Sequence, residues 1–111
     1  MASSEPVTTL VIYRPKPGAD QALEALVRKH LPVLRGLGLL GPGQSIAFRA
    51  EDKRSHAVSF VELFQWKDGQ ASEVAHQTPE VMAVWEPMGN IMEGYNGTES
   101  PIAIAHLEPL T

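Results

Sequence analysis

The 111-residue chain contains no cysteine, which excludes disulfides, thiolate nucleophiles and cysteine-ligated zinc. Aromatic residues are also few, at 6% of the chain. No apolar run approaches the roughly 20 residues that a bilayer-spanning helix needs. The N-terminal residues lack the basic and apolar regions of a signal peptide. Because cysteine-free chains suit a reducing compartment, we expect a cytoplasmic protein.

Positive charge is scarce in the second half of the chain. Residues 62–111 hold one Lys or Arg and eight Asp or Glu, whereas residues 1–61 hold eight and five. The late acids are spread along one helical region and its flanks, which is typical of a solvated face. The formal net charge of −4 argues against a partner that is nucleic acid or an anionic membrane. The length predicts one domain over residues 7–111, preceded by a flexible N-terminus at residues 1–6.

Hydrophobic periodicity predicts the element order β-α-β-β-α-β. The β-branched run at residues 7–13 predicts a strand, and the three-and-four spacing over residues 20–34 predicts a helix that kinks at Pro32. Thr78 and Pro79 are typical of the N-cap and first residue of a second long helix. This α+β order is the ferredoxin-like split arrangement, a four-stranded antiparallel sheet with both helices on one face. The remaining expected elements are strands at 45–50, 56–66 and 101–107 and a helical turn at 70–77.

Large apolar side chains alternate onto both faces of the predicted sheet. In the third strand, Phe60 and Phe64 share one face, while Val61 and Leu63 share the other. One helical layer covers only one face of a sheet. A second copy packing sheet against sheet would cover the other face, so we expect a homodimer. The alternative is that a few apolar residues are simply exposed.

The stretch at residues 61–68 (VELFQWKD), followed by Ala71, Ala75-His76 and Pro79, resembles the antibiotic biosynthesis monooxygenase (ABM) domain. The opening strand, the turn at residues 14–18 (RPKPG) and the following helix resemble that family too. The resemblance covers about residues 7–108 and implies a dimeric α+β barrel. The family includes cofactor-independent monooxygenases of electron-rich aromatics, haem-degrading proteins and members without an assigned activity.

The resemblance implies no cofactor for this chain. Haem-degrading members rely on an Asn in the first strand, with a Trp and a His ten residues apart around the second helix. Here the first strand has no Asn, and His76 precedes Trp85, so haem chemistry does not carry over. No pair of the four histidines has the spacing of a metal-ligand motif, so we expect no metal.

Glu62 is the most conspicuous candidate for catalysis. It lies in the middle of the third strand, on the same face as Phe60 and Phe64. A buried carboxylate is costly without a partner, and such a Glu can act as a general base. The alternative is a structural Glu that pairs with Arg49 or His76, or lies at a barrel mouth.

His76 is the second candidate catalytic residue, at the position of the family's His. A neutral imidazole there could take a proton from a phenol or hold a substrate oxygen, in a cavity shared with Glu62. The alternative is a helix-terminal His that caps backbone carbonyls or hydrogen-bonds the sheet. His30 follows the apolar stripe of the first helix and is typical of a core histidine. His30 and His106 are weaker candidates for catalysis, and His56 is expected to be exposed.

A flat apolar pocket could bind the substrate. Trp85 is better explained as helix-on-sheet core, because it shares a helical period with Val81 and Met88. Arg49 could pair with Glu62, bind an acidic ligand or lie on the surface. The candidate substrate-binding residues are Trp66, Phe60, Phe64, Tyr13, Arg49 and Trp85.

The function predicted from the resemblance is oxygenation of a small phenolic or polycyclic aromatic. A base, His76 or Glu62, would form the phenolate, whose electron density can pass to O2. One alternative is a non-catalytic small-molecule-binding or stress-associated dimeric barrel. Another is an isomerase or cyclase of the same barrel type. All three rest on analogy between folds.

Overall fold

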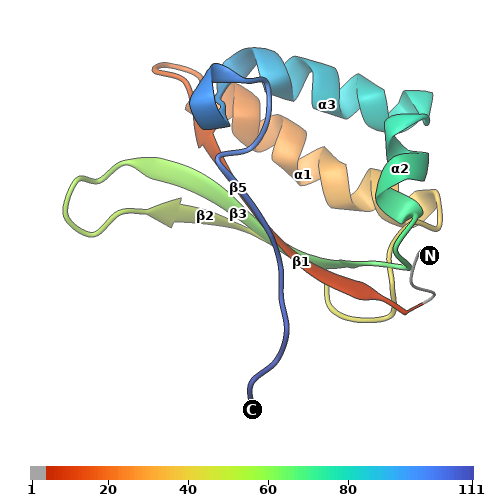
Figure 1. The fold of residues 1–111 in the computed structure, drawn as a ribbon. Helices are drawn as coiled ribbons and strands as arrows, with labels where there is room; N and C mark the ends of the chain where they lie inside the picture. The colour runs from red at the N-terminus through yellow and green to blue at the C-terminus, as the bar shows by residue number, and fades with distance from the viewer. Residues whose placement is uncertain (1–4) are drawn as a thin grey trace.

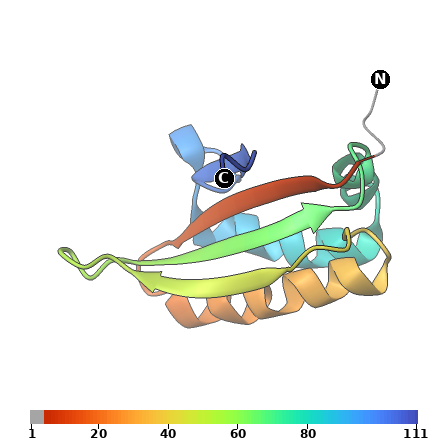
Figure 2. The same ribbon diagram turned by 90° about the horizontal axis from the view of Figure 1, so that it is seen from below.

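The computed structural model describes residues 5–111 and shows one curved sheet with its helices on one face (Figures 1 and 2). The predicted flexible N-terminus, residues 1–6, lies largely outside the described residues. No helix in the described part of the chain has the length and apolar character needed to cross a bilayer. The elements in chain order are β1 (Val7–Pro15), α1 (Asp20–Gly36), β2 (Ile46–Glu51), β3 (Val58–Trp66), α2 (Ala71–His76), α3 (Pro79–Ile91), β4 (Met92–Glu93), the 3-10 helix η1 (Tyr95–Gly97) and β5 (Ala103–His106).

The sheet has the predicted split topology. β1 pairs antiparallel with β3, from Val7 opposite Trp66 to Tyr13 opposite Phe60. β2 pairs with the other edge of β3, and β5 pairs with β1, both antiparallel. The two-residue strand β4, which the sequence did not predict, pairs with the end of β1. The ferredoxin-like α+β fold is therefore confirmed.

The two faces of the sheet are both apolar, as the alternation predicts. Toward the helices, β1 and β3 bury Val11, Tyr13, Phe60, Phe64 and Trp66. On the outer face lies a second apolar set that no element of the described chain covers. Within it, Phe48 is 49% exposed and Ile46 is 36% exposed. We call this set the outer apolar face: Leu10, Ile12, Ile46, Phe48, Val61 and Leu63.

Prolines lie inside α1 and at the first position of α3. α1 continues through Pro32, which lies on its exposed face, so the carbonyl that proline leaves without a partner can meet water. The helix therefore runs without interruption past Pro32, and no new helix starts there. α3 begins at Pro79, as expected, with Thr78 at the N-cap. The Thr78 hydroxyl nevertheless makes no capping bond, because it donates to the Val74 carbonyl at 2.7 Å.

Candidate functional site

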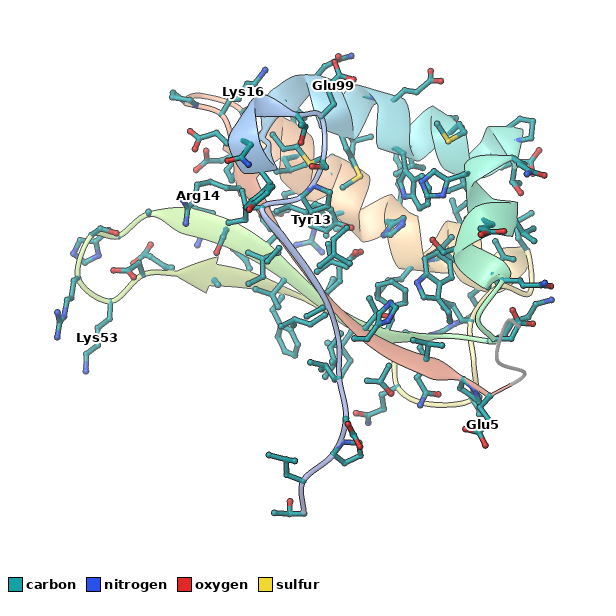
Figure 3. The ribbon with its side chains drawn as sticks, viewed as in Figure 1. Glu5, Tyr13, Arg14, Lys16, Lys53 and Glu99 are labelled. Atoms are coloured by element: carbon teal, nitrogen blue, oxygen red, sulfur yellow. The ribbon has the colours of Figure 1, made fainter. Side chains whose placement is uncertain are left out.

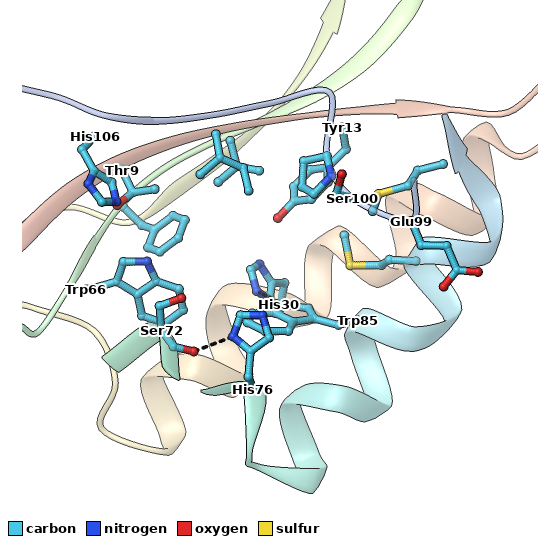
Figure 4. A pocket seen from close by; sticks show the side chains of 16 residues that line it. Thr9, Tyr13, His30, Trp66, Ser72, His76, Trp85, Glu99, Ser100 and His106 are labelled. Atoms are coloured by element: carbon cyan, nitrogen blue, oxygen red, sulfur yellow. Dashed lines mark hydrogen bonds between the residues drawn. The ribbon is translucent and has the colours of Figure 1, made fainter. Parts of the chain in front are cut away.

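A cavity of about 270 Å³ opens between the helix-facing side of the sheet, the helices and the segment that leads into β5 (Figure 4). Its wall is mainly apolar and aromatic, with a few polar side chains from different elements. Such a lining, with few polar groups, is typical of small-molecule sites. The lining residues are Thr9, Val11, Tyr13, His30, Phe64, Trp66, Ser72, His76, Trp85, Met88, Met92, Glu99, Ser100, Pro101, Ile104 and His106.

A chain of hydrogen bonds runs through the buried side of this pocket. The Tyr13 hydroxyl donates to Glu62 Oε1 at 2.5 Å. His30 Nδ1 lies 2.8 Å from Glu62 Oε2 and 2.9 Å from Oε1. Trp85 Nε1 donates to His30 Nε2 at 2.7 Å. Glu62 is fully buried, and His30 and Tyr13 are 2% and 4% exposed. We call these four residues the buried chain.

The donors in the buried chain fix its proton positions. An indole N–H can only donate, so His30 Nε2 must accept, and the ring proton of the neutral imidazole lies on Nδ1. His30 therefore donates to Glu62. Burial raises the pKa of the Tyr13 hydroxyl well above 10.0, and the charge and hydrogen bond of Glu62 raise it further. Tyr13 keeps its proton, and Glu62 accepts from both neighbours.

Strand register and helix periodicity bring these side chains together. Glu62 lies opposite Val11, so its side chain faces α1 between the positions of Tyr13 and Thr9. His30 belongs to the buried stripe of α1, as the sequence predicted. Figure 3 shows Tyr13 between the sheet and the helices, whereas Lys53 lies at the far tip of the β2–β3 turn.

The predicted partners of Glu62 were wrong. The sequence offered Arg49 or His76, and the structure pairs Glu62 with Tyr13 and His30. Arg49 lies on β2 with a 53% exposed side chain, and its Nε is 4.0 Å from Glu24 Oε1. Of the expectations for Arg49, the structure matches the surface position.

His76, the last residue of α2, lies at the mouth of the pocket. Its Nδ1 is 2.8 Å from the Ser72 carbonyl oxygen (Figure 4). A carbonyl can only accept, so Nδ1 carries the proton and Nε2 keeps a lone pair. No described residue bonds that Nε2. The ring packs edge-on against Trp85, with centroids 4.7 Å apart. His76 thus bonds a backbone carbonyl and also presents a basic nitrogen beside an aromatic wall.

The pocket gathers some of the predicted binding residues and not others. Trp66, Phe64, Tyr13 and Trp85 line it together with His76, whereas Phe60 and Arg49 do not. Phe60 is a core residue, 2% exposed. Glu62 does not line the pocket. It is hydrogen-bonded to two residues that do, Tyr13 and His30.

Several pocket residues were missed from the sequence. Ser72 on α2 and the segment at residues 99–101 contribute polar lining. A single serine in a six-residue helix and an irregular segment carry no periodic signal, so no sequence pattern identifies them. Within residues 5–111, no three His, Asp or Glu side chains form a group that could hold a metal ion.

By sequence, the chain matches no protein-family model and no curated protein. By structure, it is similar to solved proteins over almost its whole length. PA3566 from Pseudomonas aeruginosa is 21% identical with a TM-score of 0.67, covering 98% of each chain. A protein described as an antibiotic biosynthesis monooxygenase is 14% identical with a TM-score of 0.68, covering 95% of this chain and 99% of its own.

The chain shares its fold with solved antibiotic biosynthesis monooxygenases. This agrees with the family resemblance that the sequence motifs suggest. A variant of SnoaB, a cofactor-independent oxygenase from Streptomyces nogalater, is also similar in structure, at 13% identity and a TM-score of 0.64, covering 96% of this chain and 95% of its own.

Proposed function

We propose that this ABM-fold protein is a monooxygenase of the ABM family that needs no cofactor and acts on a small phenolic aromatic bound in the pocket. One observation carries the proposal: His76, whose Nε2 bonds no described residue, lines a cavity together with Trp66, Phe64 and Trp85. The fold shared with a cofactor-independent oxygenase gives additional support. A flat aromatic ligand suits these walls, and an imidazole is a suitable base for a phenol.

In the proposed reaction, His76 Nε2 takes the phenolic proton and leaves an electron-rich phenolate that reduces O2. For an anthrone, the net change replaces the two hydrogens of the ring methylene with one oxygen atom. The second oxygen atom leaves as water, so O2 is the only oxidant required. The aromatic walls orient the ring and exclude water. Glu62 does not line the pocket and acts by accepting hydrogen bonds from Tyr13 and His30, which do.

Oxygen consumption with a panel of anthrones and quinols tests this proposal. His76→Asn keeps a side-chain donor for the Ser72 carbonyl but has no basic nitrogen. We expect it to lower kcat by about 100-fold or more, which is the usual contribution of a general base. His56→Asn is the matched control, because His56 is exposed in the β2–β3 turn at φ 63°, which Asn tolerates.

The wild-type product should contain one atom of oxygen-18 when the reaction is run under labelled O2. Two results would contradict the proposal: no member of the panel consumes oxygen, or His76→Asn matches His56→Asn in rate. Tight binding without oxygen consumption would favour the small-molecule-binding alternative. Rearrangement of a ligand without oxygen consumption would favour the isomerase or cyclase.

We also propose that two copies pack through the outer apolar face to form the α+β barrel. Phe48 supports this, because half of its large apolar side chain is exposed next to Ile46 and Val61 on one face. Sedimentation should give twice the 12.1 kDa of one chain. Phe48→Asp should raise the dissociation constant at least tenfold, because it places a charge in a dry interface. A mass of one chain at every concentration would refute the dimer.

A further inference from the structure

The buried side of the pocket offers a ligand few hydrogen-bond donors. Tyr13, His30 and Trp85 each line the pocket, and each has one N–H or O–H in the assigned tautomer. All three of these donors are used within the protein. Trp85 donates to His30, and both His30 and Tyr13 donate to Glu62. What remains for a ligand is a free lone pair on the Tyr13 oxygen.

We infer that Glu62 sets the hydrogen-bond polarity of the pocket, so that it selects aromatic ligands bearing hydroxyl groups over their carbonyl or ether counterparts. Glu62 is the end point of the buried chain and can only accept as a carboxylate. It therefore turns the Tyr13 O–H away from the ligand. This inference rests on the proposed function only in taking the same pocket as the ligand site.

At the mouth of the pocket, His76 also presents a hydrogen-bond acceptor and no free donor. Its N–H is held by the Ser72 carbonyl, so Nε2 is a second acceptor. A ligand hydroxyl can donate to either acceptor. A carbonyl or ether oxygen in the same place would face a lone pair and lose its own hydrogen bond to water, which is costly. Sites built to bond a hydroxyl discriminate strongly against analogues that lack it.

The charges around the pocket also favour neutral ligands. Among the described lining residues there is no Lys or Arg, and Glu99 adds a carboxylate to the wall. Two donors at the rim remain available, the Ser72 hydroxyl and the His106 ring. Neither lies in the buried chain, so the selection is assigned to Tyr13 and Glu62. A hydroquinone is therefore expected to bind more tightly than its quinone.

Calorimetric titration with 1-naphthol and 1-methoxynaphthalene tests the inference. The two ligands share the ring system and differ in one donor. Titration without oxygen prevents turnover. We expect 1-naphthol to bind about tenfold more tightly, from one hydrogen bond gained and one acceptor left without a partner. Tyr13→Phe should remove most of this preference. Tyr95→Phe is the matched control, because Tyr95 is 63% exposed and does not line the pocket.

The Glu62→Gln variant distinguishes a role of Glu62 in the hydrogen-bond polarity of the pocket from a purely structural role. The amide oxygen can still accept from His30, because Trp85 fixes the His30 tautomer. The amide nitrogen then donates to the Tyr13 oxygen, which frees the Tyr13 O–H to donate into the pocket. The preference should therefore shift by at least severalfold toward 1-methoxynaphthalene. A merely structural role for Glu62 would weaken both ligands equally.

Three results would overturn the inference: equal affinities of the wild type for the two ligands, binding of neither, or an unchanged affinity ratio in a folded Glu62→Gln variant. If the ratio behaves as expected while no phenol consumes oxygen, the oxygenase proposal fails and this inference stands.

Discussion

The buried hydroxyl of Tyr13 makes the stability of this fold sensitive to alkaline pH. Burial, followed by the charge and hydrogen bond of Glu62, raises the pKa of Tyr13 well above 10.0. In the unfolded chain, a tyrosine titrates near 10. Above about pH 10 the unfolded state therefore loses a proton that the folded state keeps. The stabilisation is fully present below pH 10 and is lost as the pH rises toward the folded pKa.

The size of the effect follows from linkage. One group that ionises only in the unfolded state lowers the free energy of unfolding by up to about 1.4 kcal/mol per pH unit. Between pH 9 and pH 11, an unfolded pKa near 10 gives a loss of about 1.4 kcal/mol. Urea unfolding of the wild type, Tyr13→Phe and Tyr95→Phe over this range measures it. Tyr13→Phe should lack this component, and Tyr95→Phe should keep it. Lysines are common to all three proteins, so their titration cancels in the comparison.

Absorbance provides an independent check. The chain has two tyrosines, so in Tyr95→Phe the phenolate band reports Tyr13 alone. That band should appear only as the circular dichroism signal of the folded state is lost. A phenolate that forms near pH 10 in a folded protein would refute the reasoning. So would a Tyr13→Phe protein whose stability falls with pH as steeply as that of the wild type.

Two further substitutions test a hydrogen bond within the site and a close backbone contact outside the pocket lining. Trp85→Phe removes the donor to His30 Nε2, so we expect a loss of about 1–2 kcal/mol in urea unfolding and a changed His30 ring signal in 15N NMR. An unchanged ring signal would contradict the assigned tautomer. Gly94→Ala would drive a Cβ into the carbonyl oxygen of Thr98, so we expect a loss of at least about 2 kcal/mol. Gly36→Ala is its control, because a Cβ there meets nothing within 4 Å, and a loss as large as that of Gly94→Ala would contradict the argument.

The sequence predicts the elements well because their patterns are local. Alternation along residues 58–66 and three-and-four spacing along residues 20–34 recur within single elements. Strand β4 has two residues, too few for any period to appear. The same alternation placed Glu62 on one face with Phe60 and Phe64, and the structure turns that face toward the helices. The apolar stripe correctly predicted that His30 is buried.

The pairing within the site could not be predicted in the same way. Which side chain meets Glu62 depends on the β1–β3 register and on where α1 crosses the sheet, and neither is a local property. Arg49 lies on the helix-facing side of β2. Because β2 is an edge strand of the sheet, the long Arg49 side chain reaches solvent and Glu24. Phe60 shares a face with Phe64, yet only Phe64 lines the pocket, because position along the strand also decides what a side chain meets.

The buried chain is better explained by selectivity than by stability. Burying a carboxylate costs several kcal/mol even with good partners, and replacing a buried polar group and all its partners with apolar residues is often neutral or stabilising. We therefore expect the combined variant Tyr13→Phe, His30→Leu and Glu62→Met to unfold at a urea concentration close to that of the wild type. The Trp85 N–H is only partly buried and can turn to water in the open pocket. Such a variant should bind 1-naphthol and 1-methoxynaphthalene with nearly equal affinity. If it instead unfolds several kcal/mol more easily while keeping the preference for naphthol, the chain serves the fold, and the selectivity belongs to His76.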